Sequence, residues 1–211
     1  MEGSGMIFRL FAAMDWIMRF AYVHFVWLLF TVLGLGVFGL FPATNAMFAI
    51  MRKWLAGEQD IAVFSFMWKN YKAEFLKCNG FFYSLLLQGG LLYFYLRLFQ
   101  WNEGLIFTIL SIILTIIGLV FCISLVVAMP IYVHYQMGIL SFYKTIWYIV
   151  LSFPFHMITV AAILVGFYYL MYWIPGLFPF LSFSVLAFLI MWVLQLVFHQ
   201  MDAKKTVTMI E

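Results

Sequence analysis

Long apolar runs separated by short polar stretches set the pattern of this chain. Between Thr145 and Met201 there is no Asp, Glu, Lys or Arg, and only Pro154 and the cluster 175–179 interrupt the run. One helix needs about 20 apolar residues to cross a bilayer. The run is therefore long enough for two membrane-spanning helices joined by a tight turn.

Charge-free windows in the rest of the chain predict three further spans. The five expected spans cover residues 21–41, 81–98, 105–129, 155–172 and 180–198, and Pro130 closes the third. At 1.5 Å per residue, each is long enough for a hydrocarbon core about 30 Å thick. Barrel strands would alternate apolar and polar side chains, and these runs do not. The sequence predicts an all-α polytopic fold, with residues 1–211 as a single membrane domain.

Composition supports the same class. The chain is 67% hydrophobic and only 9% charged, and its mean hydropathy is +1.09. A soluble domain carries about 25% charged residues, so a soluble globular protein is excluded. Arg9, Asp15 and Arg19 interrupt the first apolar stretch, so we expect no cleaved signal peptide. Residues 6–20 form either an outer interfacial helix or an extension of the first span.

Basic residues are unevenly divided between the two sides that five spans define. Eight lie on the side that holds residues 42–80, residues 130–145 and the C-terminal tail, against three on the other. The eight are Arg52, Lys53, Lys69, Lys72, Lys77, Lys144, Lys204 and Lys205, and the three are Arg9, Arg19 and Arg97. Cytoplasmic loops are rich in Lys and Arg, so we expect the N-terminus outside and the C-terminus inside. Arg9 and Arg19 act against this orientation.

Residues 42–80 form the longest polar stretch and predict two helices on the cytoplasmic side. Pro42 suits the first turn of a helix, and Gly57 is a normal helix stop. A second helix is expected after Asp60, because apolar residues then recur every three or four positions. The lysines occupy its other side, which is typical of an amphipathic helix lying at the membrane interface. The alternative is a docking surface for a partner protein.

That alternative defines a candidate interaction surface. Its residues are Pro42, Thr44, Asn45, Arg52, Lys53, Trp54, Trp68, Lys69 and Tyr71. Basic and aromatic side chains dominate this set, and Trp and Arg are the residues that most often dominate protein interfaces.

Several apparent motifs do not indicate chemistry. Residues 34–39 match G-x-G-x-x-G, but that fingerprint requires a strand before it, and we interpret the glycines as close helix packing or a kink. His24 and His156 fall within spans and are interpreted as groups that hydrogen-bond between helices or lie near an interface, rather than as functional groups. Cys78 and Cys122 are expected to be free thiols. No catalytic, cofactor or metal residues are assigned, so neither an enzyme nor a nucleic-acid partner is expected.

The segment 27–79 closely resembles the YesL family, also called domain of unknown function 624. The most specific parts are Gly34 to Arg52 and the run Met67-Trp68-Lys69-Asn70-Tyr71-Lys72, followed by Glu74 to Lys77. His24-Phe25 departs from the family pattern, where an Asn is expected. The resemblance implies a bacterial, mostly Gram-positive, integral membrane protein whose gene often lies beside carbohydrate ABC importers. It implies no reaction and transfers no catalytic residues.

The leading hypothesis is therefore a non-enzymatic accessory or assembly factor of a carbohydrate ABC importer in the bacterial cell membrane. It would act through its cytoplasmic segment. The alternative is a small transporter or channel with its path between helices. A membrane-embedded enzyme is a third class, but the sequence offers no catalytic constellation for it.

Overall fold

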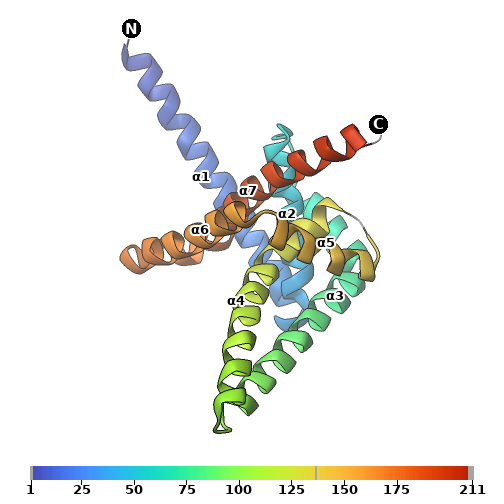
Figure 1. Ribbon diagram of the computed structural model, residues 1–211. Coiled ribbons are helices and arrows are strands. Elements are labelled where there is room, and N and C mark those ends of the chain that lie inside the picture. The colour runs from blue at the N-terminus through green and yellow to red at the C-terminus, as the bar shows by residue number, and fades with distance from the viewer. Residues whose placement is uncertain (1, 136, 209–211) are drawn as a thin grey trace. The chain divides into compact units, whose positions relative to one another are not determined.

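The computed structural model describes residues 2–135 and 137–208 (Figure 1). Within these ranges the chain forms seven α-helices and one short 3₁₀ helix, and no strand. The helices are α1 (Glu2–Leu33), α2 (Val37–Leu55), α3 (Val63–Gln100), α4 (Leu105–His134), α5 (Ile139–Ser152), α6 (Pro154–Trp173), η1 (Pro175–Leu177) and α7 (Phe178–Thr208). The predicted all-α class is confirmed.

Four of the described helices are long and apolar enough to cross a membrane. The qualifying segments are Leu10–Leu33, Leu105–His134, Pro154–Trp173 and Pro179–Ala203. The predicted polytopic membrane character is confirmed, but the number of five spans is only approximate. The expected span 81–98 lies within α3, where Gln88 and Arg97 lower the hydropathy, and α3 is not among the four.

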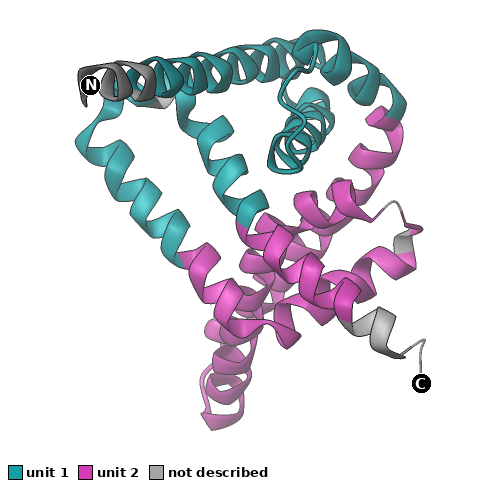
Figure 2. Cartoon of the chain, turned by 90° about the horizontal axis from the view of Figure 1, so that it is seen from above, with its two compact units in different colours: residues 1–73, 162–192 teal, residues 74–161, 193–211 magenta. Residues whose placement is uncertain are grey.

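The helices fall into two compact units (Figure 2). Unit 1 comprises Met1–Ala73 and Ala162–Trp192, and unit 2 comprises Glu74–Ala161 and Val193–Glu211. Helices α3, α6 and α7 therefore each contribute residues to both units.

The centre of unit 1 is a hairpin in which α2 runs antiparallel to α1. Gly36 in the connecting turn has φ of +75°, a backbone conformation that glycine adopts without strain. Close approach of the helices depends on Gly34 and Gly39, because a Cβ built on Gly34 would lie 2.2 Å from Cα of Gly39. Farther along the hairpin, Trp27 Nε1 donates a 3.0 Å hydrogen bond to Thr44 Oγ1.

This hairpin corrects two predictions. The first span was expected at 21–41, but α1 ends at Leu33 and the span candidate is Leu10–Leu33. The charge-free window continued past Leu33 because the turn itself consists of glycine and apolar residues. Pro42 was expected in the first turn of a helix, but α2 starts at Val37 and contains Pro42. Packing against neighbouring helices compensates for the backbone N–H donor that proline lacks.

Several segments that the sequence left separate belong to continuous helices in the structure. Residues 6–20 belong to α1, so they extend the first span rather than forming a separate helix. Arg19 and Asp15 pair across one turn of α1, with Nε and Oδ2 2.7 Å apart. Gly57 follows the end of α2 with φ of +90°, so the predicted stop is confirmed. The amphipathic helix expected after Asp60 and the expected span 81–98 form the single helix α3.

The first part of α7 completes the aromatic packing of unit 1. Trp27 stacks on Phe183 with ring centroids 4.6 Å apart, and Phe20 meets Phe188 edge-on at 5.3 Å. Since the later residue of α1 contacts the earlier residue of α7, the two helices are antiparallel within this unit.

Unit 2 contains a second antiparallel hairpin, formed by α3 and α4. A Cβ on Gly89 of α3 would lie 2.9 Å from Phe121 Cε1 of α4. Pro130 was expected to close the third span, but α4 continues through it to His134. Helix α5 was not predicted, and its buried Phe142 packs against Phe81 and Tyr132 with ring centroids 5.1 and 5.6 Å away.

Candidate functional site

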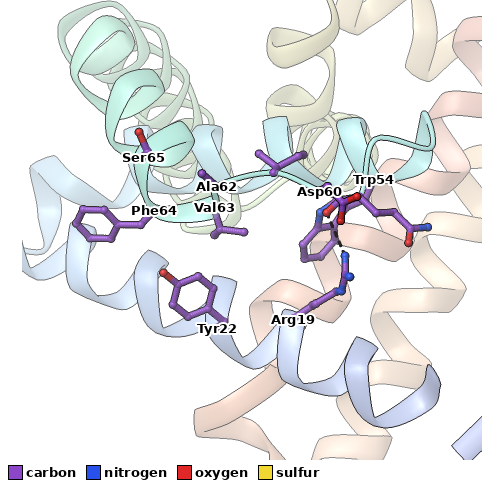
Figure 3. A pocket seen from close by; sticks show the side chains of 10 residues that line it. Arg19, Tyr22, Trp54, Asp60, Ala62, Val63, Phe64 and Ser65 are labelled. Atoms are coloured by element: carbon purple, nitrogen blue, oxygen red, sulfur yellow. Dashed lines mark hydrogen bonds between the residues drawn. The ribbon is translucent and has the colours of Figure 1, made fainter. Parts of the chain in front are cut away.

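The α2–α3 loop and the adjoining face of α1 line an open cavity of about 580 Å³ in unit 1 (Figure 3). Its walls come from α1, from the end of α2, from the loop and from the first turn of α3. The lining residues are Arg19, Tyr22, Trp54, Gln59, Asp60, Ile61, Ala62, Val63, Phe64 and Ser65. Basic, acidic and aromatic side chains thus share one hollow beside a helix that can cross a membrane.

Arg19 connects the loop to α1. Its Nε donates to Asp15, and its Nη1 donates a 3.0 Å hydrogen bond to the carbonyl oxygen of Gln59. The guanidinium therefore ties the start of loop segment 59–62 to α1, although Arg19 and Gln59 are 40 positions apart in the sequence. This contact could not be predicted from the sequence, because any residue type can supply a backbone carbonyl.

Trp54 lies inside unit 1 rather than on its surface. It is 4% exposed, and its ring meets Trp16 and Phe20 edge-on with centroids 5.6 and 5.7 Å away. Its Nε1 is buried and has no hydrogen-bond partner among the described residues. As long as unit 1 keeps this packing, Trp54 cannot contact a protein partner through its ring faces.

The other predicted surface residues of α2 are also directed mainly into the hairpin. Pro42 and Asn45 are buried, and Thr44 is half-buried with its hydroxyl donating to the carbonyl of Leu40 at 2.7 Å. Threonine commonly satisfies its hydroxyl with the carbonyl one turn back. These three residues stabilise the hairpin and contribute little surface.

Arg52 and Lys53 stand in the last turn of α2 and are partly exposed. Cations are favourable at the carboxyl end of a helix because of its dipole. Lys53 forms an ion pair with Glu58, and its Nζ lies 5.4 Å from the centre of the Phe66 ring. Lys53 is thus partly neutralised within the chain.

The part of the predicted surface that remains exposed is on α3. Trp68 and Lys69 are exposed, and Lys72, one turn after Trp68, places Nζ 4.7 Å from the centre of the indole. Tyr71, whose ring stacks beside that of Trp68, is buried, and burial raises the pKa of its phenol. We call Phe64, Trp68, Lys69 and Lys72 the α3 face, because all four are exposed within unit 1.

Comparison with known proteins identifies the family of this chain. The family described as "Protein of unknown function, DUF624" matches residues 20–96. Uncharacterized protein YteU of Bacillus subtilis (strain 168) is 35% identical over 188 residues, covering 89% of this chain and 84% of the relative. The chain belongs to the DUF624 family.

Two further relatives from the same organism agree. Uncharacterized protein YesV is 37% identical over 173 residues, covering 79% of this chain and 80% of the relative. Uncharacterized protein YesL is 30% identical over 151 residues, with coverage of 72% and 71%. The resemblance identified from the sequence is confirmed. No solved structure matches the chain.

The family match includes all of α2, the second half of α1 and most of α3. It includes the glycines of the first hairpin, and the interpretation of Gly34 to Gly39 as close helix packing agrees with the geometry. The match also covers the α3 face and every lining residue of the cavity except Arg19. Arg19 immediately precedes the matched range.

The histidines within spans serve as packing groups in the structure. His24 is buried and stacks near Phe183, with ring centroids 6.1 Å apart. His156 is accompanied by Phe153, with ring centroids 5.9 Å apart. Among the residues that the structure describes, no group of three His, Cys, Asp or Glu side chains could hold a metal ion.

Unit 2 contains two polar contacts that the sequence did not suggest. Tyr132 donates a 2.6 Å hydrogen bond to Glu74, joining α4 to α3. His134 stacks on Phe198 with centroids 4.0 Å apart, and its Nε2 lies 4.0 Å from Asp202. Residue type alone could not reveal either contact, since each joins separate helices.

Both cysteines are free thiols, as predicted. Cys78 is buried in unit 2, where burial and the nearby Glu74 carboxylate raise the pKa of its thiol. A thiol that stays protonated is a poor nucleophile. Cys78 is therefore a packing residue rather than a reactive group.

Proposed function

We propose that the protein is a non-enzymatic accessory or assembly factor of a carbohydrate ABC importer in the bacterial cell membrane. It would bind the importer through the α3 face defined above. The carbohydrate link comes from the family resemblance, and the observation that carries the choice of surface is the exposure of Trp68 beside Lys69 and Lys72. The proposal keeps Trp68 and Lys69 of the surface expected from the sequence and adds Phe64 and Lys72. It leaves out Trp54, Asn45 and Tyr71, which are buried.

The α3 face has the properties of a protein-binding surface. Trp68 offers an aromatic anchor, and its ring is oriented by Phe30 and Tyr71 with centroids 5.5 and 6.1 Å away. A side chain held in place before binding loses less conformational entropy when a partner covers it. The lysines around it would favour an acidic partner and accelerate association.

The proposal includes an orientation, with the N-terminus outside and the C-terminus inside. It requires that cysteines introduced by Ser4→Cys and Lys204→Cys be labelled from opposite sides of sealed membranes, in a Cys78→Ser, Cys122→Ser background. A membrane-impermeant maleimide should modify the first site in intact cells and the second only after permeabilisation. Labelling of both sites from one side would contradict the orientation.

Partner binding and plain lipid anchoring by α3 predict different effects of substitutions on the recovery of the importer. If the α3 face binds the importer, Trp68→Ala should reduce its recovery about 30-fold, since a Trp hot spot contributes about 2 kcal/mol or more. Lys69→Glu should reduce it about fivefold, because an exposed charge contributes about 1 kcal/mol. The measurement is the amount of importer subunits that co-purify from native membranes, at equal levels of the folded protein.

The matched control is Trp101→Ala. Trp101 is 90% exposed in the turn between α3 and α4, so it tests the loss of an exposed indole outside the α3 face. Recovery of the importer should be unchanged in this variant. If Trp68→Ala and Trp101→Ala behave alike, the α3 face is not the docking surface, and the helix serves only as an interfacial anchor.

A further inference from the structure

The cavity of unit 1 has two chemically different ends. Figure 3 shows Arg19, Asp60 and Trp54 gathered at one end, and Tyr22 and Phe64 toward the other. A ligand that fills it must therefore carry charge at one end and apolar surface at the other.

The charged end offers unused hydrogen-bond donors. A guanidinium has five N–H donors, and Arg19 uses Nε and one Nη1 proton for Asp15 and Gln59. Three donors remain for a ligand. Trp54 also lines this end, but its Nε1 is buried beneath the cavity surface and offers no donor to a ligand there.

The backbone at the cavity adds to this preference for an anion. The first turn of α3 begins at Val63 and lines the cavity as far as Ser65. The first N–H groups of a helix have no partner within the helix, and the dipole gives this end partial positive charge. Together with Arg19, these groups suit the oxygens of a phosphate.

Asp60 adds a negative charge to the same end of the cavity. This end therefore favours a ligand that carries a cationic group beside its anionic group. Its carboxylate is exposed and has no ion pair among the described residues, because Arg19 is paired with Asp15 instead. A simple phosphate would be repelled by this carboxylate. A group that combines a phosphate with a nearby ammonium would satisfy Arg19 and Asp60 together.

The remaining side of the cavity indicates where such a group comes from. Tyr22 belongs to an exposed apolar stripe on α1, spaced at helical intervals along a helix that can cross a membrane. The stripe consists of Met18, Tyr22, Phe25 and Leu29. Acyl chains could follow this stripe away from the cavity. A sugar is less suitable, because Trp16 and Phe20 cover the Trp54 ring that would have to stack on it.

We propose that this cavity binds a phosphoethanolamine group, supplied by phosphatidylethanolamine. The phosphate contacts Arg19 and the first turn of α3, and the primary ammonium contacts Asp60. The acyl chains lie along the apolar stripe of α1. The site shares Phe64 with the α3 face, but its charged groups, Arg19 and Asp60, lie outside that face, and binding does not require the proposed importer.

The test is native mass spectrometry of the full-length protein in detergent, titrated with phosphatidylethanolamine or phosphatidylglycerol of identical acyl chains. The wild-type protein should prefer phosphatidylethanolamine about fivefold, the contribution of one exposed ion pair. Asp60→Asn should abolish this preference, because the amide keeps the shape but loses the charge. Arg19→Gln should weaken binding of both lipids about tenfold, because both carry the phosphate.

Glu58→Gln is the matched control, since Glu58 is an exposed carboxylate two residues away that does not line the cavity. It should leave the lipid preference unchanged. A third arm adds soluble glycerophosphoethanolamine as a competitor. Failure to displace the lipid assigns the site to the membrane phospholipid, whereas full displacement at similar concentration assigns it to a free phosphoethanolamine compound. Equal affinity of the wild-type protein for the two lipids, or an unchanged preference in Asp60→Asn, overturns the proposal.

Discussion

Gly34→Ala is expected to destabilise the protein severely. The new Cβ would lie 2.2 Å from Cα of Gly39 and 2.5 Å from the hydroxyl oxygen of Tyr71. The first contact is with backbone, which cannot rotate away, so α1 and α2 must separate. Forcing extra atoms into a packed core costs about 3 kcal/mol at the upper end of the usual range. The measurement is the temperature of half-unfolding in detergent, followed by size-exclusion chromatography after heating.

Gly80→Ala provides the control for this substitution. Gly80 lies inside α3, and nothing stands within 4 Å of its added Cβ. Alanine is the better helix former by about 1 kcal/mol, so this variant should be equally or slightly more stable. A Gly34→Ala protein that unfolds at the wild-type temperature would show that the helices do not approach each other at this point.

The same glycines explain where sequence reasoning about the fold succeeded and where it failed. Expected spans 105–129, 155–172 and 180–198 lie within α4, α6 and α7, because hydropathy averaged over a long window is insensitive to single residues. The turn after Leu33 was missed for the same reason. It is made by backbone conformation at Gly36, not by polarity, so no charge interrupts the window.

Two prolines led to predicted helix boundaries at positions where the helices in fact continue. The sequence predicts a helix start at Pro42 and a helix end at Pro130, yet both residues lie inside helices. A proline removes one backbone donor, and neighbouring helices can compensate for that loss within a membrane. Composition alone cannot indicate whether such neighbours are present.

The candidate site was predictable only in part. The basic and aromatic character of residues 42–80 identified the segment, and α3 does expose Trp68 and Lys69. Which face of each helix is buried depends on its neighbours, and these are distant in sequence. Trp54 was therefore assigned to a surface although Trp16 covers it, and Arg19 was not connected with the loop that it holds.

Phe30→Ala should have the second large effect, on stability and on the α3 face together. Phe30 is fully buried, and its ring lies 5.5 Å from Phe64, 5.5 Å from Trp68 and 5.3 Å from Tyr71, centroid to centroid. Truncating a buried Phe usually costs about 3 kcal/mol or more, because a cavity remains. We expect a lower unfolding temperature and, below that temperature, weaker recovery of the proposed partner.

Phe11→Ala separates this packing effect from the loss of any aromatic ring on α1. Phe11 is 66% exposed on the same helix, so its truncation should change the free energy of unfolding by no more than about 0.5 kcal/mol. If the two variants unfold alike, α3 does not pack on Phe30. If only Phe30→Ala loses both stability and partner recovery, the ring that stabilises unit 1 also positions the α3 face. Trp68 would then depend for its function on a residue of α1 that no partner touches.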